Sequence, residues 1–68
     1  MPPRPKPLGS RLRLYRTRLG LTIPELSRRS GVSVGTISNA ENNVGDIRVS
    51  NLVAILAALG QPNPFQQT

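Results

Sequence analysis

The chain has 68 residues, a formal net charge of +6, no histidine and no cysteine. A chain of this length has room for one small core and is marginally stable alone, and no apolar run approaches the roughly 20 residues that cross a bilayer. Its only carboxylate side chains are Glu25, Glu41 and Asp46, too few for a catalytic or metal-binding cluster, so we expect no enzyme, no metal and no cofactor.

The excess of cations favours nucleic acid as the partner, ahead of an anionic membrane surface. Two of the cations, Arg4 and Lys6, lie in residues 1–7, which also contain four prolines. Prolines in this number predict an extended, solvated arm outside the core. Such an arm could reach into a minor groove of DNA through Arg4 and Lys6, or remain a tail without contacts.

The first predicted helix follows the arm. Leu12, Tyr15 and Leu19 recur at helical spacing and predict a helix over Ser10–Leu19. Ser10 is its candidate N-cap. Gly20 is placed to end it in a left-handed conformation, with the apolar Leu21 closing the turn.

Two further helices are predicted after short turns. Residues Thr22 to Glu25 match a capping box, in which the threonine hydroxyl and the glutamate each accept a bond from the other's backbone amide. Gly31 ends this second helix because glycine adopts positive φ at little cost. Ser33 then caps a third helix that runs to about Asn42.

A fourth helix is predicted from about Val49 to Leu59, ending at Gly60. Its start is less clearly marked: Asp46 is a candidate N-cap, but Arg48 beside the positive end of the helix dipole is electrostatically unfavourable. Residues 61–68 contain two prolines and are expected to be non-helical. The chain therefore divides into a basic arm (1–7), one helical domain (8–60) and a tail (61–68), in which an extended strand could pair across a dimer.

The segment LTIPELSRRSGVSVGTISNAE, residues 21–41, resembles the helix-turn-helix of the lambda-repressor-like (XRE, Cro/CI) family. The shared features are a capped helix, apolar residues that lock two helices together, a small residue at their crossing and a turn glycine. They are carried by Leu26, Ser27, Gly31, Val32, Ser33, Ile37, Ser38 and Glu41. The resemblance covers roughly residues 8–60 and implies an all-α, compact four-helix domain, without the fifth helix usual in the family. The alternative is an unrelated four-helix packing module.

The resemblance also implies which residues contact DNA when the third helix enters the major groove. The base-contacting positions are Ser33, Val34, Gly35, Ser38 and Asn39. The positions at the DNA backbone are Arg16, Thr22, Ile23, Thr36, Asn42, Asn43 and Arg48. Asn39 is the best hydrogen-bonding candidate because asparagine can engage adenine bidentately. Val34 could touch a thymine methyl group or be a partly buried residue of the helix start.

Arg16 and Glu41 occupy the family positions of a structural ion pair that ties the first helix to the end of the third. Such a pair would hold the Arg16 guanidinium near a phosphate. As an isolated surface pair it would contribute little stability. The alternative is two separate solvated charges.

The predicted fourth helix is apolar on all sides, whereas a helix that buries only one face carries polar residues on the other. With Leu52, Ile55 and Leu59 assigned to the core, a strip of smaller side chains remains. This strip, with a residue of the tail, is a candidate homodimer interface made of Val53, Ala54, Ala57 and Phe65, with Leu14 as a further candidate. A helix packed under the tail is the alternative.

The resemblance implies a regulator of transcription, most simply a repressor that binds an inverted-repeat operator as a homodimer in the cytoplasm of a bacterial, phage or plasmid host. TISN-x-ENN is also similar to HipB-type antitoxins, so an antitoxin with a toxin partner, or a controller of a restriction-modification locus, is the runner-up. A protein-interaction module that uses this fold to contact a partner is the alternative from another class. A cationic peptide of membrane surfaces is a more distant one.

Overall fold

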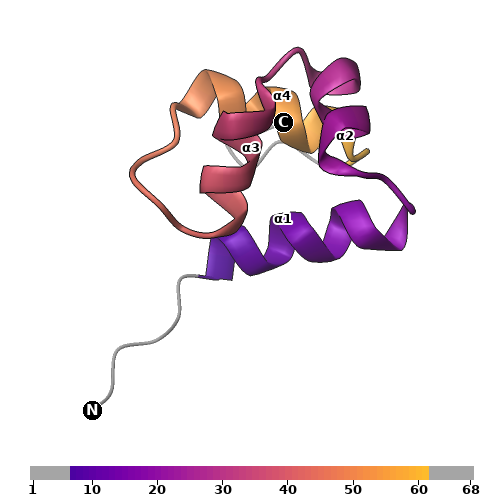
Figure 1. The fold of residues 1–68 in the computed structure, drawn as a ribbon, viewed down its shortest axis with the longest axis horizontal. Helices are drawn as coiled ribbons and strands as arrows, with labels where there is room; N and C mark the ends of the chain where they lie inside the picture. Colours follow the sequence, from indigo (N-terminus) through magenta and orange to yellow (C-terminus); the bar gives the residue numbers. More distant parts are fainter. Residues whose placement is uncertain (1–6, 62–68) are drawn as a thin grey trace, which may run out of the picture.

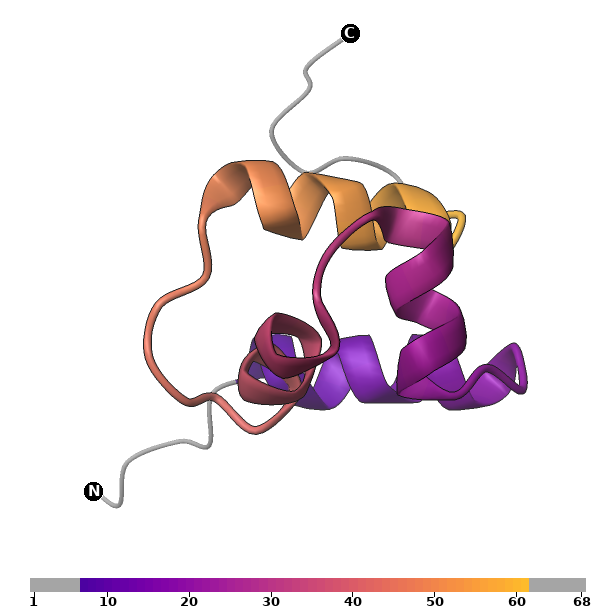
Figure 2. The ribbon, with the colours of Figure 1, turned by 45° about the horizontal axis from the view of Figure 1, so that its top comes forward.

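The computed structural model describes residues 7–61, which form four helices and no strand. The helices are α1 (Pro7–Arg18), α2 (Ile23–Ser30), α3 (Val34–Glu41) and α4 (Val49–Ala58). α1 and α4 run along opposite sides of the domain, α2 spans between them, and α3 packs on α1 and α2 (Figure 1; Figure 2). The predicted all-α four-helix domain is confirmed. No helix within residues 7–61 is both long and apolar enough to cross a membrane.

The first helix begins earlier than its sequence predicts. It starts at Pro7, so Ser10 lies inside the helix and the prediction that Ser10 is its N-cap is wrong. Proline suits the first helical position because its ring sets a helical φ and its missing N–H would have no partner there. Pro7 therefore belongs to the helix and not to the arm. Arg4 and Lys6 lie outside the described residues.

The end of α1 is the one predicted. Gly20 adopts a left-handed φ of 70°, its amide donates to the Thr17 carbonyl at 3.0 Å, and the Leu21 amide donates to the Arg16 carbonyl at 3.1 Å. These two bonds make a Schellman motif, which satisfies carbonyls that the helix leaves free. Leu21 is buried directly after it.

Both predicted caps of the central helices are present. At α2, the Thr22 hydroxyl accepts from the Glu25 amide at 3.2 Å, and the Glu25 carboxylate accepts from the Thr22 amide at 3.0 Å. Gly31 ends α2 with a φ of 75°. At α3, the Ser33 hydroxyl accepts from the Thr36 amide at 3.2 Å.

The start of α4 differs from the prediction. Its N-cap is Arg48, which makes no side-chain capping bond, whereas Asp46 is exposed and lies two residues earlier. The prediction of an Asp46 cap is therefore wrong. The loop from α3 to α4 passes through Asn43 and Gly45, both with positive φ, and the helix begins only after Arg48, too late for Asp46 to be its N-cap.

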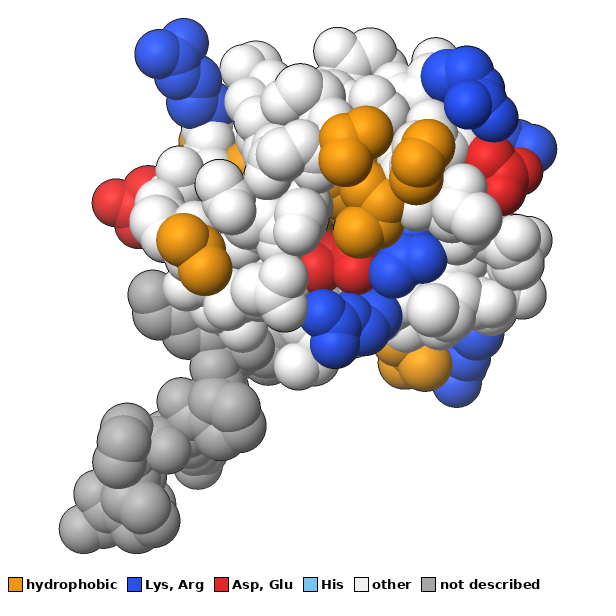
Figure 3. Space-filling model, viewed as in Figure 1, with side chains coloured by type: hydrophobic (Ala, Val, Ile, Leu, Met, Phe, Trp, Pro, Cys, Tyr) orange, Lys and Arg blue, Asp and Glu red, His pale blue; other side chains and the backbone are white. Residues whose placement is uncertain are grey.

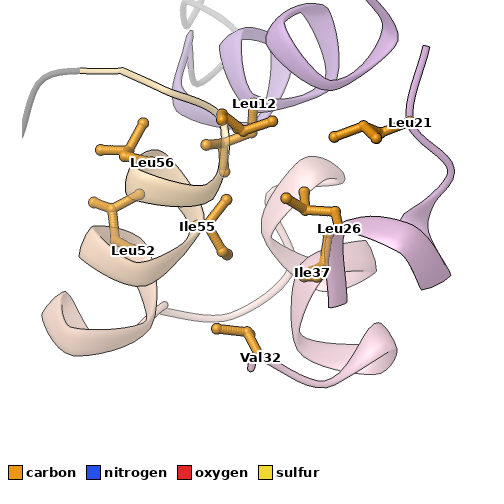
Figure 4. Packing of buried hydrophobic residues seen from close by; sticks show 9 residues of the cluster. Leu12, Leu21, Leu26, Val32, Ile37, Leu52, Ile55 and Leu56 are labelled. Atoms are coloured by element: carbon orange, nitrogen blue, oxygen red, sulfur yellow. The ribbon is translucent and has the colours of Figure 1, made fainter. Parts of the chain in front are cut away.

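All four helices contribute to one core. Figure 4 shows Leu12 of α1, Leu26 of α2, Ile37 of α3 and Ile55 of α4 converging on its centre, and these four side chains are fully buried. The remaining buried apolar residues are Leu21, Val32, Leu52, Leu56 and Leu59. Leu56 is also buried, although only Leu52, Ile55 and Leu59 of this helix were expected in the core, so the domain itself covers more of the apolar surface of α4 than expected.

Candidate nucleic-acid interface

Several of the predicted contact positions lie on the outer face of α3. Gly35, Asn39 and Asn42 are exposed and Ser38 is half-buried, at the spacing of one helix face. On the opposite face, Ile37 packs into the core. The four polar or small residues thus form a continuous strip along α3, which we call the α3 face (Gly35, Ser38, Asn39, Asn42).

The first turn of α3 separates the predicted base-contacting residues into two kinds. Val34 is 44% exposed, so its methyl groups are available at the surface. The Ser33 hydroxyl accepts from the Thr36 amide and donates to the Thr36 hydroxyl at 2.8 Å. The bond uses the hydroxyl hydrogen of Ser33, whereas Thr36 only accepts in it and keeps its own hydroxyl hydrogen as a donor.

Arg16 and Glu41 are joined by two charge-assisted hydrogen bonds. Arg16 Nε lies 2.6 Å from Glu41 Oε2, and Arg16 Nη2 lies 2.9 Å from Glu41 Oε1. Arg16 Nη1 also donates to the Leu21 carbonyl at 2.8 Å. The Glu41 side chain is 1% exposed, so these are not two solvated charges. The hydrogen bond to Glu41 raises the pKa of Arg16, which stays positively charged at every physiological pH.

A second arginine, Arg13, reaches the same end of α3 and was not singled out from the sequence. Its Nη2 donates to Asn42 Oδ1 at 2.8 Å, and its Nε lies 3.4 Å from Glu41 Oε1. Figure 3 shows an acidic side chain near the middle of the view, with basic side chains beside and below it and hydrophobic side chains above it. The signal available in the sequence was the spacing of Arg13 from Arg16, which puts both on one side of α1.

Asn43 has a structural position that the sequence analysis did not assign. It adopts a left-handed φ of 57° directly after α3, and its side-chain oxygen accepts from the Gly9 amide at 3.2 Å. The Val44 amide donates to the Asn39 carbonyl at 2.8 Å, so α3 ends in the same motif as α1, with asparagine in place of glycine. Asn43 was predicted at the DNA backbone, but its side-chain oxygen is occupied within the domain.

The N-terminus of α2 offers little side-chain chemistry. The Thr22 hydroxyl is held by the capping box, and Ile23 is half-buried against the core. Hydrogen bonds from the backbone and side chain of Thr22 lower the pKa of Glu25, with smaller contributions from Arg28 and Arg29. The carboxylate is therefore ionised at neutral pH beside this helix end.

A groove of about 310 Å³ lies between α3, the following loop and the start of α4. Its walls include the predicted contact residues Thr36, Asn39 and Arg48 together with Asp46 and Asn51. The exposed Arg48 thus lines a groove on one side of the α3 face, whereas Arg16 lies on the other side of α3, where α1 packs. The structure brings basic side chains to both flanks of α3.

The three described residues of α4 that were predicted at a dimer interface differ in exposure. Ala54 is half-buried and packs against the core, Val53 is half-buried, and Ala57 is exposed. Leu14, on the outer side of α1, is 44% exposed. Phe65 lies outside the described residues.

Comparison with protein families gives one match, to the helix-turn-helix family HTH_3 of the Cro/C1 (XRE) type, over residues 12–62. The match includes α2, α3 and α4 and most of α1, and it confirms the resemblance inferred from the sequence. Comparisons with curated proteins and with solved structures gave no match.

Proposed function

Because the chain belongs to the Cro/C1-type (XRE) helix-turn-helix family, whose domain implies DNA binding, we propose that it is a transcriptional repressor that binds an inverted-repeat operator as a homodimer. The observation that carries the proposal is the α3 face, a polar strip on a helix with basic side chains on both flanks. A helix of this kind fits the major groove of B-DNA, which is about 12 Å wide.

The proposed base contacts come from the α3 face and from Val34, with Ser33 in a supporting role. Asn39, exposed in the middle of α3, presents a carboxamide that can accept from and donate to one adenine. Ser38 adds a hydroxyl, and Val34 offers methyl groups to a thymine. Gly35 carries no side chain and lets the backbone approach a base edge. Ser33 contributes through the first turn that it caps.

Backbone contacts hold α3 in register in the groove. At the N-terminus of α3 the Ser33 hydroxyl occupies the Thr36 amide, so we assign the Val34 and Gly35 amides of the first turn as phosphate donors. At α2 the capping box occupies the Thr22 and Glu25 amides and Pro24 carries no N–H, which leaves the Ile23 amide. Arg48 lies on one flank of α3, with Thr36 in the same groove wall. Asn42, at the C-terminal end of α3, accepts from Arg13 and donates one amide hydrogen to the Ser38 carbonyl, so we assign its second amide hydrogen to a phosphate. Arg16 has most of its donors engaged with Glu41 and Leu21, so its contribution is mainly to hold α3 in place. Ile23 is apolar and packs against the core, and the side-chain oxygen of Asn43 accepts from the Gly9 amide, so we assign both residues a structural role.

Dimerisation would place two α3 faces on one side of the duplex, with half-sites about 10 base pairs apart. The exposed Ala57 and half-buried Val53 of α4 are the described residues that we assign to this contact. A small domain gains stability from such an interface.

Selection of bound sequences from a random duplex library, at about physiological salt, tests the proposal. An enriched inverted repeat supports a dimeric operator-binding protein. An enriched single half-site contradicts only the dimer and leaves sequence-specific DNA binding in place. Binding without enrichment that fades as salt rises would leave only charge attraction, contradict the proposed function and favour a protein partner. An Asn39→Ala variant selected in parallel should lose preference at one position of each half-site, by about 1–3 kcal/mol.

A further inference from the structure

The Arg13 side chain lies between α1 and the last turn of α3, with its charge at the surface. It is 52% exposed, although its Nη2 donates to Asn42 Oδ1 at 2.8 Å. Among residues 7–61, its Nη1 donates no hydrogen bond. The guanidinium is therefore oriented by Asn42, with a longer contact to Glu41, while several of its N–H groups have no partner among the described residues.

The charge of Arg13 contributes little to the stability of the fold. Glu41 already receives two short bonds from Arg16, at 2.6 and 2.9 Å, whereas the Arg13 contact with Glu41 is 3.4 Å long. An ion pair in which one partner is half exposed contributes little to stability. With Arg13 and Arg16 beside one carboxylate, this end of α3 keeps an excess positive charge of one.

The position of that charge matches a DNA backbone. Asn42, which holds Arg13, is the last residue of the α3 face, one turn after Ser38. A helix with side chains is about 10–12 Å across, nearly the width of the major groove, so the phosphates that border the groove lie directly beside its flanks. An arginine held at such a flank presents its donors to a phosphate with little loss of side-chain freedom.

We infer that Arg13 binds a phosphate at the edge of the major groove, with Asn42 holding the guanidinium in position. This inference rests on the proposed function, and it adds to the interface a residue of α1 that lies outside the helix-turn-helix pair. Arg13 and Arg48 would then contact the backbone from the two flanks of α3.

The test measures the affinity of the full chain for its selected duplex at several salt concentrations. The variants are Arg13→Gln, which loses the charge but keeps an amide for Asn42, and Arg13→Lys, which keeps the charge. Arg11→Gln is the matched control, since Arg11 is exposed on the same helix but about 200° around its axis. Thermal unfolding of each variant shows that it is folded under the assay conditions.

A phosphate contact contributes about 0.9 to the slope of log affinity against log salt. We expect Arg13→Gln to lower the magnitude of the slope by about that amount and the affinity about 5- to 10-fold at physiological salt, equally on specific and non-specific duplexes. Arg13→Lys should keep the wild-type slope. A slope for Arg13→Gln equal to that of the wild type, or a change no larger than that of Arg11→Gln, would overturn the inference. If the wild type itself enriches no sequence, the proposed function fails first, so the two failures are distinguishable.

Discussion

The backbone amide of Gly9 donates to the side-chain oxygen of Asn43 at 3.2 Å, across 34 positions of sequence. Gly9 lies in the first turn of α1, where backbone amides have no partner within the helix, and Asn43 supplies one. With Arg13 at Asn42 and Arg16 at Glu41, this bond completes a row of contacts from one side of α1 to the C-terminal end of α3. α1 therefore acts as a brace that fixes the direction of the proposed recognition helix.

The close approach at Gly9 predicts that no side chain is tolerated there. A Cβ at this position would lie 2.5 Å from the Glu41 carbonyl oxygen and 2.7 Å from that of Ala40, and both are backbone atoms. We expect Gly9→Ala to lower the free energy of unfolding by about 1–3 kcal/mol, because α1 and α3 must separate. Denaturant titration followed by circular dichroism measures the loss, and an unchanged midpoint would contradict the brace.

Gly35→Ala is the matched substitution on α3 and should have the opposite effect on stability. A Cβ at Gly35 meets no atom within 4 Å. Alanine in a helix is favoured over glycine by about 0.5–1 kcal/mol, so the unfolding midpoint should rise. If the Gly35 backbone approaches a base edge, as we propose, the same variant should bind its operator more weakly although it is more stable. Equal or tighter binding in a fluorescence anisotropy titration would contradict that placement.

The two arginines beside Glu41 should differ in their effect on stability. Arg16→Ala leaves a carboxylate that is 1% exposed without its main partner, which costs about 3 kcal/mol for a buried ion pair. Arg13→Ala removes a half-exposed partner and should cost less than about 1 kcal/mol. Thermal unfolding of both variants tests this order, and equal losses would show that Arg13 shares the structural role of Arg16.

Glu25 predicts a dependence of stability on acid pH. Its pKa is lowered from an ordinary value of 4.5 by the hydrogen bonds of the capping box. A carboxylate whose folded pKa is depressed stabilises the fold above the unfolded pKa, and that stability is lost as pH falls through the folded pKa. We therefore expect the melting temperature of the wild type, relative to Glu25→Gln, to fall with pH below about 4.5. Glutamine keeps an oxygen for the Thr22 amide, and parallel melting curves for the two proteins would contradict the capping role of the charge.

Substitutions of Ser33 and Asn39 should distinguish the effect of the α3 cap on stability from the effect of α3 on DNA binding. Ser33→Ala removes the bond to the Thr36 amide and should cost about 1 kcal/mol of stability. Asn39→Ala removes an exposed side chain and should leave stability within about 0.5 kcal/mol, while the affinity for the operator falls about 10-fold or more. Calorimetric unfolding and titration with the duplex measure the two effects, and a destabilised Asn39→Ala would contradict its placement on the α3 face.

The sequence was most informative where partners lie close together in the chain. The capping box of Thr22 and Glu25 spans three positions, as does the bond from Thr36 to Ser33, and Gly20 closes α1 through residues only a few positions earlier. Such contacts form within one helix turn, so their residue types and spacing are sufficient to predict them. Failure came at Ser10 and Asp46, where a plausible capping side chain was present but the helix began elsewhere.

By itself, the sequence determined that this protein consists of capped helices with the spacing and turn residues of a helix-turn-helix. It also determined that the chain is basic and has few side chains suited to catalysis. Only the tertiary structure decided that Asn43 caps α1, that Arg13 reaches Asn42 and that Leu56 is buried. The bonds of Gly9 and Arg13 join residues 34 and 29 positions apart, so they depend on the angle at which α1 crosses α3. That angle follows from how all the core side chains pack together, which no local pattern of residues specifies.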